Sequence, residues 1–242
     1  MKQGEDGYGQ MLLAALEGRD VVEIVERDDG FIEAAGGPSM YLAPFRRWHP
    51  LDRRAMRFAR GRVLDVGCGG GRVCLHLQER GQDVVGIDIS PGAVDVCRKR
   101  GVRDARLCSI DDVDESLGVF DTIVMLGNNF GLFASAAKAK RLLRRFHRVT
   151  SERGRIVAAT RDVYRTDDPA HLAYQERNRS RGRMSGQIRL RVRYRDHATP
   201  WFDYLMVSRD ELEGLLDGTG WQLERALESE DTYVAIIDKT TP

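Results

Sequence analysis

The chain has 242 residues, of which 42% are hydrophobic and 31% are charged, and its formal net charge is +1. This length suffices for one large α/β domain, and the composition excludes a disordered or collagen-like chain. The apolar stretch from Met11 to Leu16 is too short to span a bilayer, so we expect no membrane association. The four cysteines form no Cys-x-x-Cys pair, which favours a reducing compartment and therefore the cytoplasm.

Charge is unevenly distributed along the chain. Residues 137–195 carry 18 Lys and Arg against 5 Asp and Glu, while residues 196–242 carry 3 against 11. Two interpretations fit this pattern: the two segments neutralise each other across the fold or across a dimer, or the basic segment binds an anion. A monomer and a homodimer are both compatible with it.

Between residues 61 and 161, short β-rich runs alternate with helical patterns, which is typical of repeated βαβ units and a mostly parallel sheet. The predicted strands are Arg62–Val66, Asp83–Asp88, Ala105–Ser109, Phe120–Leu126 and Arg155–Thr160. The predicted helices are 72–80, 91–100 and 135–149. Ser90 and Pro91 supply an N-cap and a first-turn proline for the second helix.

The run Gln187–Asp196 predicts an added strand, because apolar residues alternate there with arginines. One face of this strand would be apolar, and the other would carry Arg189, Arg191, Arg193 and Arg195. That basic face is either a solvated surface or a site for an anionic acceptor, such as a phosphate or carboxylate, or for a nucleic-acid backbone.

The two ends of the chain have simpler patterns. Ser208 and Glu211 form a capping box that opens a helix, and two strands follow as an antiparallel hairpin, at Trp221–Leu227 and Thr232–Asp238. Residues 1–60 are expected to be mainly helical, with a turn at Asp28-Asp29-Gly30.

The strongest chemical signal is an aliphatic strand that runs through Asp65 into a glycine-rich turn at 67–71 and then into a helix. Glycines allow the backbone to turn tightly and to approach a ligand closely. A carboxylate just before them suits a ligand with an ammonium group, and a pyrophosphate has less use for an anion there. The next strand ends in Asp88, an acid placed to accept hydrogen bonds from both hydroxyls of a ribose.

Together these motifs resemble the class I S-adenosylmethionine-dependent methyltransferases. The resemblance covers residues 61–161 and runs through the motifs VLDVGCGGGR, VVGIDIS, CSIDD, FDTIVML and FHRVTSERGRIVAAT. It implies an α/β fold with a seven-stranded, mostly parallel Rossmann-like sheet, helices on both faces, an antiparallel C-terminal hairpin and a helical N-terminal cap. We expect one methyltransferase domain over 1–242, with a cap at 1–60, a cofactor-binding core at 61–161, an inserted substrate-side segment at 162–207 and a C-terminal helix and hairpin at 208–242.

The resemblance also implies roles for residues. Asp65, Gly67 and Gly69 would hold the methionine part of S-adenosylmethionine, and Asp88 its ribose. The family usually has an Asp at the end of the third strand, where this chain has Ser109, so the backbone amide of Ile110 is the expected adenine partner. The full set of expected cofactor contacts is Tyr41, Asp65, Gly67, Cys68, Gly69, Asp88, Ile89, Ser109, Ile110, Asp111, Leu126 and Gly127.

Catalytic groups are less constrained by the sequence. Methyl transfer from a sulfonium is an in-line displacement, so the protein mainly aligns the acceptor and excludes water, and a general base is optional. Candidates for a base are His49, His171 and His197. Tyr41 and Trp48 are expected either to close over the sulfonium by cation–π contact or to pack in the core. No metal ion is expected.

We therefore predict a methyltransferase that uses S-adenosylmethionine, releases S-adenosylhomocysteine and acts on a small-molecule substrate, with an anionic substrate as one option. Two alternatives remain: an RNA methyltransferase that uses the basic stretch 137–195, and a non-catalytic S-adenosylmethionine-binding protein. An NAD-dependent dehydrogenase is disfavoured by Asp65 and by the absence of a full GxGxxG spacing.

Overall fold

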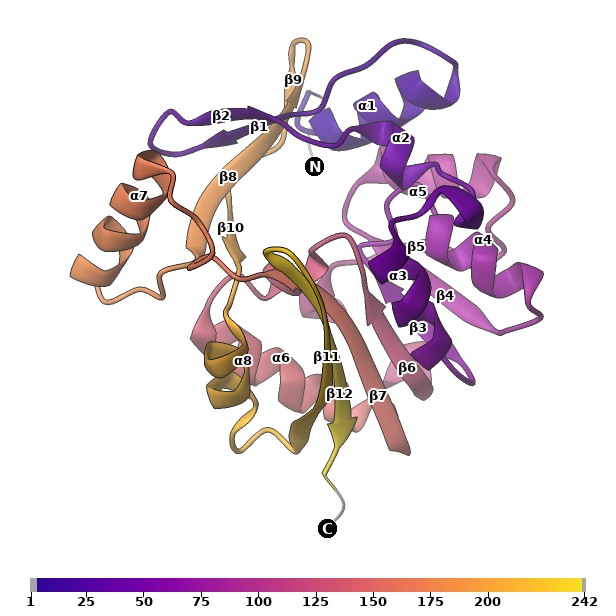
Figure 1. The fold of residues 1–242 in the computed structure, drawn as a ribbon. Coiled ribbons are helices and arrows are strands. Elements are labelled where there is room, and N and C mark those ends of the chain that lie inside the picture. The colour runs from indigo at the N-terminus through magenta and orange to yellow at the C-terminus, as the bar shows by residue number, and fades with distance from the viewer. Residues whose placement is uncertain (1–3, 241–242) are drawn as a thin grey trace. The chain divides into compact units, whose positions relative to one another are not determined.

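The computed structural model describes residues 4–240, and its contacts group the chain into two compact units. The first unit comprises Met1–His49, Leu64–Asp112 and Arg189–Phe202. The second unit comprises Pro50–Val63, Val113–Ile188 and Asp203–Pro242. Each unit therefore combines segments that are distant in the sequence, as the colours in Figure 1 show.

A seven-stranded sheet has the order β11-β12-β7-β6-β3-β4-β5. Strand β4 is parallel to β5, and β6 is parallel to β7, whereas β12 is antiparallel to both β7 and β11. The strands are β3 (Val63–Val66), β4 (Val84–Asp88), β5 (Ala105–Leu107), β6 (Phe120–Met125), β7 (Thr150–Arg161), β11 (Trp221–Ser229) and β12 (Thr232–Lys239). The predicted mostly parallel sheet and C-terminal hairpin are confirmed.

The first unit has three longer helices, α1 (Gly7–Leu16), α4 (Arg72–Glu79) and α5 (Pro91–Lys99). Helix α4 contacts β4, α5 contacts β4 and β5, and α1 contacts α5. Helix α5 begins as predicted, because the Ser90 side chain accepts a hydrogen bond from the backbone of Ala93 and Pro91 occupies the first turn. Helix α1 lies along α5, and Met11 and Leu12 are fully buried between them.

Asp6 joins the N-termini of α1 and α5. Its carboxylate caps α1 by accepting from the backbone N–H of Gly9 at 3.0 Å. The same group accepts from the Ser90 hydroxyl at 2.7 Å and from the backbone N–H of Gly92 at 2.8 Å. A negative charge is favourable at a helix N-terminus, and here one carboxylate serves two helices. Asp6 therefore fixes where α1 lies against the core of this unit.

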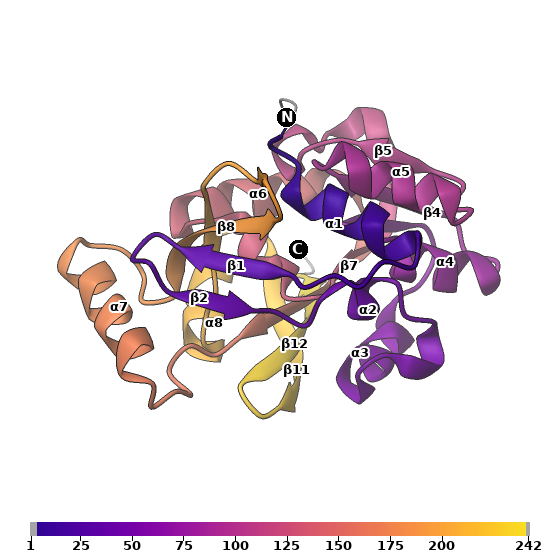
Figure 2. The same ribbon diagram turned by 90° about the horizontal axis from the view of Figure 1, so that it is seen from above.

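A second sheet has the order β10-β8-β1-β2, with β9 paired to β8. Figure 2 shows β1, β2 and β8 side by side. The strands are β1 (Ile24–Arg27), β2 (Ile32–Ala34), β8 (Gln187–Tyr194), β9 (His197–Ala198) and β10 (Phe202–Leu205). The expectation that residues 1–60 are mainly helical is therefore wrong for 24–34, which form a hairpin around the predicted turn. Strands β1 and β2 are too short to show an alternating pattern of apolar and polar residues in the sequence. They are stabilised by the pairing of β1 with β8, which lies far along the chain.

Strand β8 has the predicted apolar face, since Leu190, Val192 and Tyr194 are buried. On its basic face, Arg191 makes a two-pronged ion pair with Glu26, which lies directly opposite on β1, and Arg193 binds the same carboxylate. Part of the arginine face is thus neutralised within its own sheet.

In the second unit, Figure 1 shows α3 on one side of β7 and β12, and α6 with α8 on the other. The helices are α3 (Pro50–Ala55), α6 (Ala136–Arg148), α7 (Pro169–Ser180) and α8 (Arg209–Leu216). The capping box of Ser208 and Glu211 is present as predicted. Helix α7 was not predicted, although Asp168 caps it and Pro169 follows.

Short helices occur in both units. They are α2 (Pro38–Tyr41) and the 3-10 segments Phe45–Arg47, Met56–Phe58, Ile110–Asp112, Glu115–Leu117 and Asn129–Phe133.

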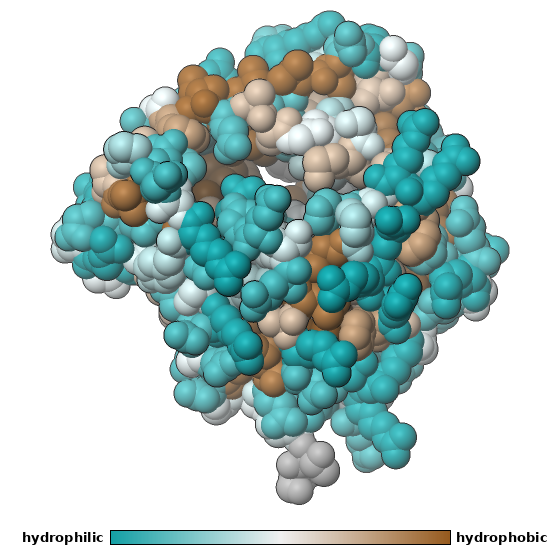
Figure 3. All heavy atoms as spheres, viewed as in Figure 1, coloured by the Kyte–Doolittle hydropathy of each residue, from teal (hydrophilic) through white to brown (hydrophobic). Residues whose placement is uncertain are grey.

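Ion pairs within the second unit join the basic stretch 137–195 to the acidic end of the chain. They are Arg155 with Asp238, Arg161 with Asp231, Arg165 with Glu228, and Arg183 with Asp203. Mutual neutralisation of the two segments, one of the two sequence-based interpretations, is therefore realised inside one chain. Figure 3 shows hydrophilic side chains over most of the face in view, with hydrophobic groups between them. Over residues 4–240, the helices are all too short or too polar to cross a membrane.

Replacing Asp6 by alanine is predicted to lower the free energy of unfolding by about 2 kcal/mol, because it removes the cap of α1 and leaves the donors at the start of α5 without their acceptor. Urea unfolding followed by circular dichroism measures the change. Asp20→Ala, at an exposed position after α1, is the matched control and should change stability by less than about 0.5 kcal/mol. Equal effects of the two substitutions would contradict the role assigned to Asp6.

Candidate functional site

The glycine-rich turn between β3 and α4 lies against the end of β4. The backbone N–H groups of Gly67 and Cys68 both donate to the carbonyl of Ile87, at 2.9 and 3.0 Å. Gly67 and Gly69 have positive φ values of 71° and 53°, a conformation that glycine adopts without strain. A side chain at Gly69 would also place its Cβ 2.6 Å from the Tyr8 hydroxyl. Both the turn and the close approach of Tyr8 therefore require glycine.

Asp88 at the end of β4 binds two backbone amides. One carboxylate oxygen accepts from the N–H of Gly69 and the other from the N–H of Ser90, each at 2.9 Å. The residue is only 7% exposed, and burial raises the pKa of its carboxyl while the two amides oppose that rise. Asp88 thus holds the glycine turn against the start of α5 and keeps lone pairs for further donors.

Asp65 on β3 is buried below the turn, with 3% of its surface exposed. Its carboxylate accepts a hydrogen bond from the Cys74 thiol, at 3.3 Å. Burial raises the pKa of Asp65 to about 7, whereas the Cys74 hydrogen bond and the charge of Arg72 act in the opposite direction. This carboxyl is therefore poised to gain a negative charge when a cation arrives.

Three thiols pack behind the turn. The sulfur of Cys68 lies 3.7 Å from that of Cys97, and the Cys97 thiol donates to the carbonyl of Gly69 at 3.1 Å. The hydrogen bond with Cys68 and then burial raise the pKa of Cys97, so the thiol stays protonated and unreactive at neutral pH. Across residues 4–240, no three His, Cys, Asp or Glu side chains are grouped so that they could hold a metal ion.

Two tyrosines of the first unit lie over this turn. The rings of Tyr8 on α1 and Tyr41 on α2 meet edge to face, with centroids 5.4 Å apart. Tyr41 donates its hydroxyl to the carboxylate of Glu23 at 2.9 Å. The carbonyl of Leu42, next to Tyr41, accepts from Arg100, whose guanidinium also binds the carbonyl of Gly70. These contacts bring Tyr41, predicted to contact the cofactor, into the neighbourhood of the glycine turn.

The predicted adenine side follows β4 and β5. Ile89, next to Asp88, is 61% exposed although it is apolar. After β5, the 3-10 segment Ile110–Asp112 begins at Ser109, whose hydroxyl accepts from the backbone of Asp111 at 3.2 Å. The predicted residues on these two segments therefore belong to the same unit as the glycine turn.

Leu126 and Gly127 belong to the second unit, after β6. Leu126 is buried, and Gly127 has a φ of 70°. The next residue, Asn128, also has a positive φ of 68°, its carbonyl accepts from the Tyr204 hydroxyl at 2.5 Å, and its side-chain oxygen is buried without a partner among the described residues. This turn therefore has a fixed conformation, and its role remains a prediction.

The three candidate histidines lie on separate segments. His49 is exposed just before α3. His171 is in α7, where its Nδ1 lies 3.4 Å from the Thr166 hydroxyl. His197 is in β9, with Nε2 3.6 Å from Asp196 and a buried Nδ1 that has no partner among residues 4–240. None of these contacts tests a catalytic role, so all three stay predictions.

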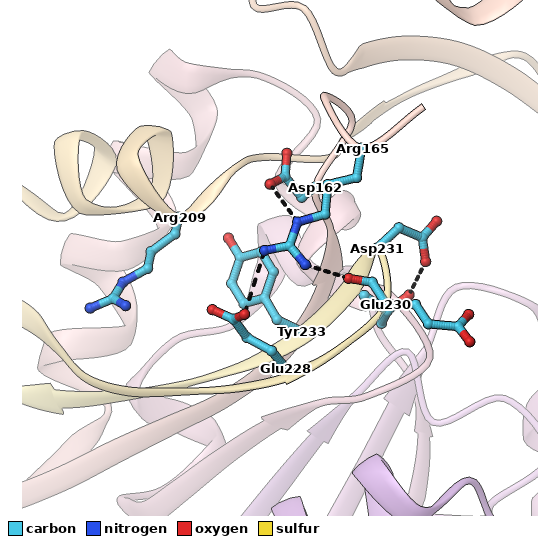
Figure 4. Close-up of a pocket in the computed structure, with 8 residues that line it drawn as sticks. Asp162, Arg165, Arg209, Glu228, Glu230, Asp231 and Tyr233 are labelled. Atoms are coloured by element: carbon cyan, nitrogen blue, oxygen red, sulfur yellow. Dashed lines mark hydrogen bonds and ion pairs between the residues drawn. The ribbon is translucent and has the colours of Figure 1, made fainter. Parts of the chain in front are cut away.

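A hollow in the second unit is shown in Figure 4. Arg165 lies in it, and its guanidinium contacts Asp162 at 3.5 Å, Glu228 at 3.4 Å and the carbonyl of Glu230. Tyr233 in its wall donates its hydroxyl to the carbonyl of Val207. Because its central cation is already bound by acids of the same unit, this hollow is a neutralised surface feature rather than an anion site.

Sequence reasoning missed Asp6, Tyr8 and Glu23. Asp6 has the local pattern of an N-cap before an apolar helix, but its bond to Ser90 spans 84 residues. Tyr8 and Glu23 carry no local signal, because the tight approach of Tyr8 to Gly69 and the burial of Glu23 depend on tertiary contacts. All three belong to the first unit, with Asp65 and Asp88.

Known proteins resemble this chain in its central part. The profile of a family described as methyltransferase domain matches residues 63–154. Magnesium-protoporphyrin O-methyltransferase of Rhodobacter capsulatus is 39% identical over 69 residues, which are 27% of this chain and 31% of that protein. Ubiquinone biosynthesis O-methyltransferase of Xanthomonas euvesicatoria is 39% identical over 95 residues, 37% of this chain and 39% of that protein. The chain thus spans less than half the length of these curated relatives.

The fold as a whole has a solved counterpart. The crystal structure of an S-adenosylmethionine-dependent methyltransferase from Bacteroides fragilis, in complex with S-adenosyl-L-homocysteine, aligns with a TM-score of 0.84 and 24% identity, over 100% of this chain and 98% of that chain. A second structure, of a methyltransferase from Methanosarcina mazei, aligns with a TM-score of 0.61 and 18% identity over 80% of this chain and 99% of that chain. These similarities establish the fold.

The raised pKa of Asp65 predicts a pH-dependent stability. The folded chain holds the Asp65 proton more tightly than the unfolded chain, where the usual pKa is 3.8. The contribution of this group to the free energy of unfolding is therefore fully present below about pH 4 and is lost as pH rises through about 7. Relative to wild type, Asp65→Asn should become steadily more stable as pH rises from about 4 to about 7 and should then level off, with a total difference of more than about 1 kcal/mol.

Urea unfolding at a series of pH values measures this difference. Asp95→Asn is the control, because Asp95 is an exposed residue of α5 that pairs with Lys99, and its curve should run parallel to that of wild type. A curve for Asp65→Asn that also runs parallel to wild type would show that Asp65 ionises normally in the folded protein.

Proposed function

We propose that this protein is a class I S-adenosylmethionine-dependent methyltransferase that transfers a methyl group from S-adenosylmethionine to a small-molecule acceptor. The match of residues 63–154 to the methyltransferase domain family supports this proposal. The product of the cofactor is then S-adenosylhomocysteine. The cytoplasm is the compartment we propose, since it keeps the three buried thiols behind the glycine turn reduced.

The observation that carries this proposal is the charge of the glycine turn. Asp65 and Asp88 are buried beside it, and no ion pair joins either of them to a cation in the part of the chain that the structure describes. Buried carboxylates without a counter-ion are unfavourable, so the site favours a positively charged ligand. S-adenosylmethionine carries an ammonium group and a sulfonium, whereas a dinucleotide would bring a pyrophosphate to the same carboxylates.

The residues present fit this cofactor. Gly67 and Gly69 give the turn after Asp65 a backbone without side chains, along which the methionine part would lie, and Asp88 keeps lone pairs for the ribose hydroxyls. Exposed Ile89 offers an apolar surface for adenine. When bound, the cofactor supplies an electrophilic methyl group on sulfur. The remaining expected contacts, Tyr41, Cys68, Ser109, Ile110, Asp111, Leu126 and Gly127, stay proposals for orienting it and excluding water.

For the acceptor, we propose a small molecule that is methylated on oxygen. The two curated relatives are named as O-methyltransferases, of magnesium-protoporphyrin and of ubiquinone biosynthesis, and each is 39% identical to the chain over its aligned part. An RNA acceptor is less favoured, because four ion pairs already bind arginines of the 137–195 stretch to acids near the end of the chain. An anionic acceptor would have to use arginines outside these pairs.

Calorimetric titration tests the cofactor. S-adenosylmethionine and S-adenosylhomocysteine should bind and NAD should not. Asp88→Ala should weaken the binding of S-adenosylmethionine and of S-adenosylhomocysteine by about tenfold or more, because hydrogen bonds to a charged acceptor contribute roughly 1.5–3 kcal/mol. Asp88→Asn, which keeps the size and one acceptor oxygen, should give an intermediate loss, and Asp95→Ala on the exposed side of α5 should give none. Binding of NAD, or binding unchanged by both Asp88 variants, would contradict the proposal.

A binding assay separates the small-molecule proposal from the RNA alternative. With a fluorescent 20-nucleotide RNA at physiological salt, anisotropy should report no binding tighter than about 100 µM. Micromolar binding that weakens steeply with salt would instead favour a nucleic-acid acceptor.

A further inference from the structure

Glu23 is a buried carboxylate without a counter-ion. It lies just before β1 and is 3% exposed. Its carboxylate accepts from the Tyr41 hydroxyl at 2.9 Å and from the backbone N–H of Gly37. Over residues 4–240, no Lys, Arg or His side chain forms an ion pair with it. Two neutral donors compensate only part of the loss of hydration that burial imposes on a carboxylate.

Glu26 on the adjoining strand β1 shows what a structural carboxylate looks like in this sheet. Glu26 on β1 is bound by Arg191 at 2.9 and 3.1 Å and by Arg193 at 3.1 Å. The chain therefore supplies two cations to the less buried Glu26 and none to Glu23. A purely structural role does not explain this difference, since replacing an unpaired buried carboxylate by a neutral residue would stabilise the fold.

Glu23 is connected to the glycine turn through two aromatic rings. Its partner Tyr41 contacts Tyr8, with ring centroids 5.4 Å apart, and a Cβ at Gly69 would lie 2.6 Å from the Tyr8 hydroxyl. The charges of Asp88 and Glu23 both act on Tyr8 and contribute to raising its pKa, after the larger effect of burial. Glu23 therefore belongs to the same buried polar group as the predicted ribose ligand, although β1 lies outside the methyltransferase motifs.

A second polar group with unused capacity lies in the same unit. Tyr194 on β8 is 8% exposed, and its hydroxyl has no hydrogen-bond partner among the described residues. Its ring belongs to the apolar cluster against which Tyr8 and Tyr41 pack. Tyr194 is thus a buried phenol without a partner, and Glu23 is a buried carboxylate without a cation. Both contact the group formed by Tyr41 and this cluster, and both can still form hydrogen bonds with a polar ligand.

Resting on the methyltransferase function proposed above, we propose that Glu23 is the general base of the reaction and that the acceptor is a hydroxyl compound. The acceptor oxygen forms its bond to the methyl carbon as the bond from that carbon to sulfur breaks, and the bonding electrons stay on sulfur. The hydroxyl proton passes to the Glu23 carboxylate and then to solvent. Charge and atoms balance, because the sulfonium loses its positive charge and one proton is released.

The surroundings of Glu23 suit this role. Burial raises the pKa of its carboxyl, and the hydrogen bonds from Tyr41 and Gly37 limit that rise. A carboxylate with a raised pKa accepts a proton more effectively than an ordinary exposed carboxylate does. Tyr41 is then a positioning residue, since it orients the carboxylate that receives the proton.

The test does not require the natural acceptor. A base that serves the acceptor must lie beside the transferring methyl group, so it will also attract a cation placed there. Sinefungin is an analogue of S-adenosylmethionine that carries a primary amine on carbon where the methyl-bearing sulfonium stands, whereas S-adenosylhomocysteine has no group at that position. The ratio of their dissociation constants, measured by calorimetry at pH 7.5, therefore reports on a carboxylate beside the methyl position.

Glu23→Gln should weaken the binding of sinefungin by about tenfold or more. The same variant should bind S-adenosylhomocysteine with the affinity of wild type. Glu33→Gln, an exposed position on β2 of the same hairpin, should leave the ratio unchanged. Tyr41→Phe keeps the carboxylate and should change the ratio less than Glu23→Gln does, which provides a reading if the glutamine variant fails to fold.

The outcomes separate the two proposals. If wild type binds neither analogue, the methyltransferase function itself fails. If wild type binds both and Glu23→Gln leaves their ratio unchanged or lowers both affinities equally, Glu23 is not beside the methyl group and the general-base proposal is overturned. If Glu23→Gln cannot be folded, the ratio of the two dissociation constants in Tyr41→Phe decides. A ratio identical to that of wild type overturns the general-base proposal, and a reduced preference for sinefungin supports it.

Discussion

Two backbone amides from different segments converge on the Asp88 carboxylate, and the arrangement of the first unit depends on this contact. The N–H of Gly69 fixes the glycine turn, and the N–H of Ser90 fixes the start of α5. Ser90 in turn donates its hydroxyl to Asp6, which caps α1. One chain of hydrogen bonds thus aligns the turn, two helix N-termini and the Tyr8 ring that approaches Gly69. A change at Asp88 will alter binding and local structure together.

Charge is handled in opposite ways in different parts of this chain. On the surface of the second unit, arginines pair with acids from the end of the sequence, so an uneven sequence becomes a neutralised structure. Around the glycine turn, Asp65 and Asp88 are buried with thiols and amides as partners instead of cations. An unpaired buried carboxylate reduces stability, so the surroundings of Asp65 and Asp88 favour a positively charged ligand at the glycine turn.

Local signals predicted most of the fold. The glycine turn, the Ser90-Pro91 start and the Ser208 capping box act over a few residues, and each is where the sequence indicates it. Features that depend on contacts between distant segments could not be predicted from these local signals. The hairpin of β1 and β2 was mistaken for helix because its strands have four and three residues and depend on β8. For the site, Asp65 and Asp88 could be identified from motifs, whereas Glu23 shows its unpaired burial only in three dimensions.

The central claim is that the buried carboxylates around the glycine turn form an S-adenosylmethionine site, and a crystal structure of the protein with S-adenosylhomocysteine tests it most directly. Both ribose hydroxyls should lie within hydrogen-bond distance of Asp88, and the methionine part should lie over Gly67 and Gly69, on the side of Asp65. Density for the ligand elsewhere, or a ribose bound by other residues while Asp88 keeps only its bonds to Gly69 and Ser90, would contradict it.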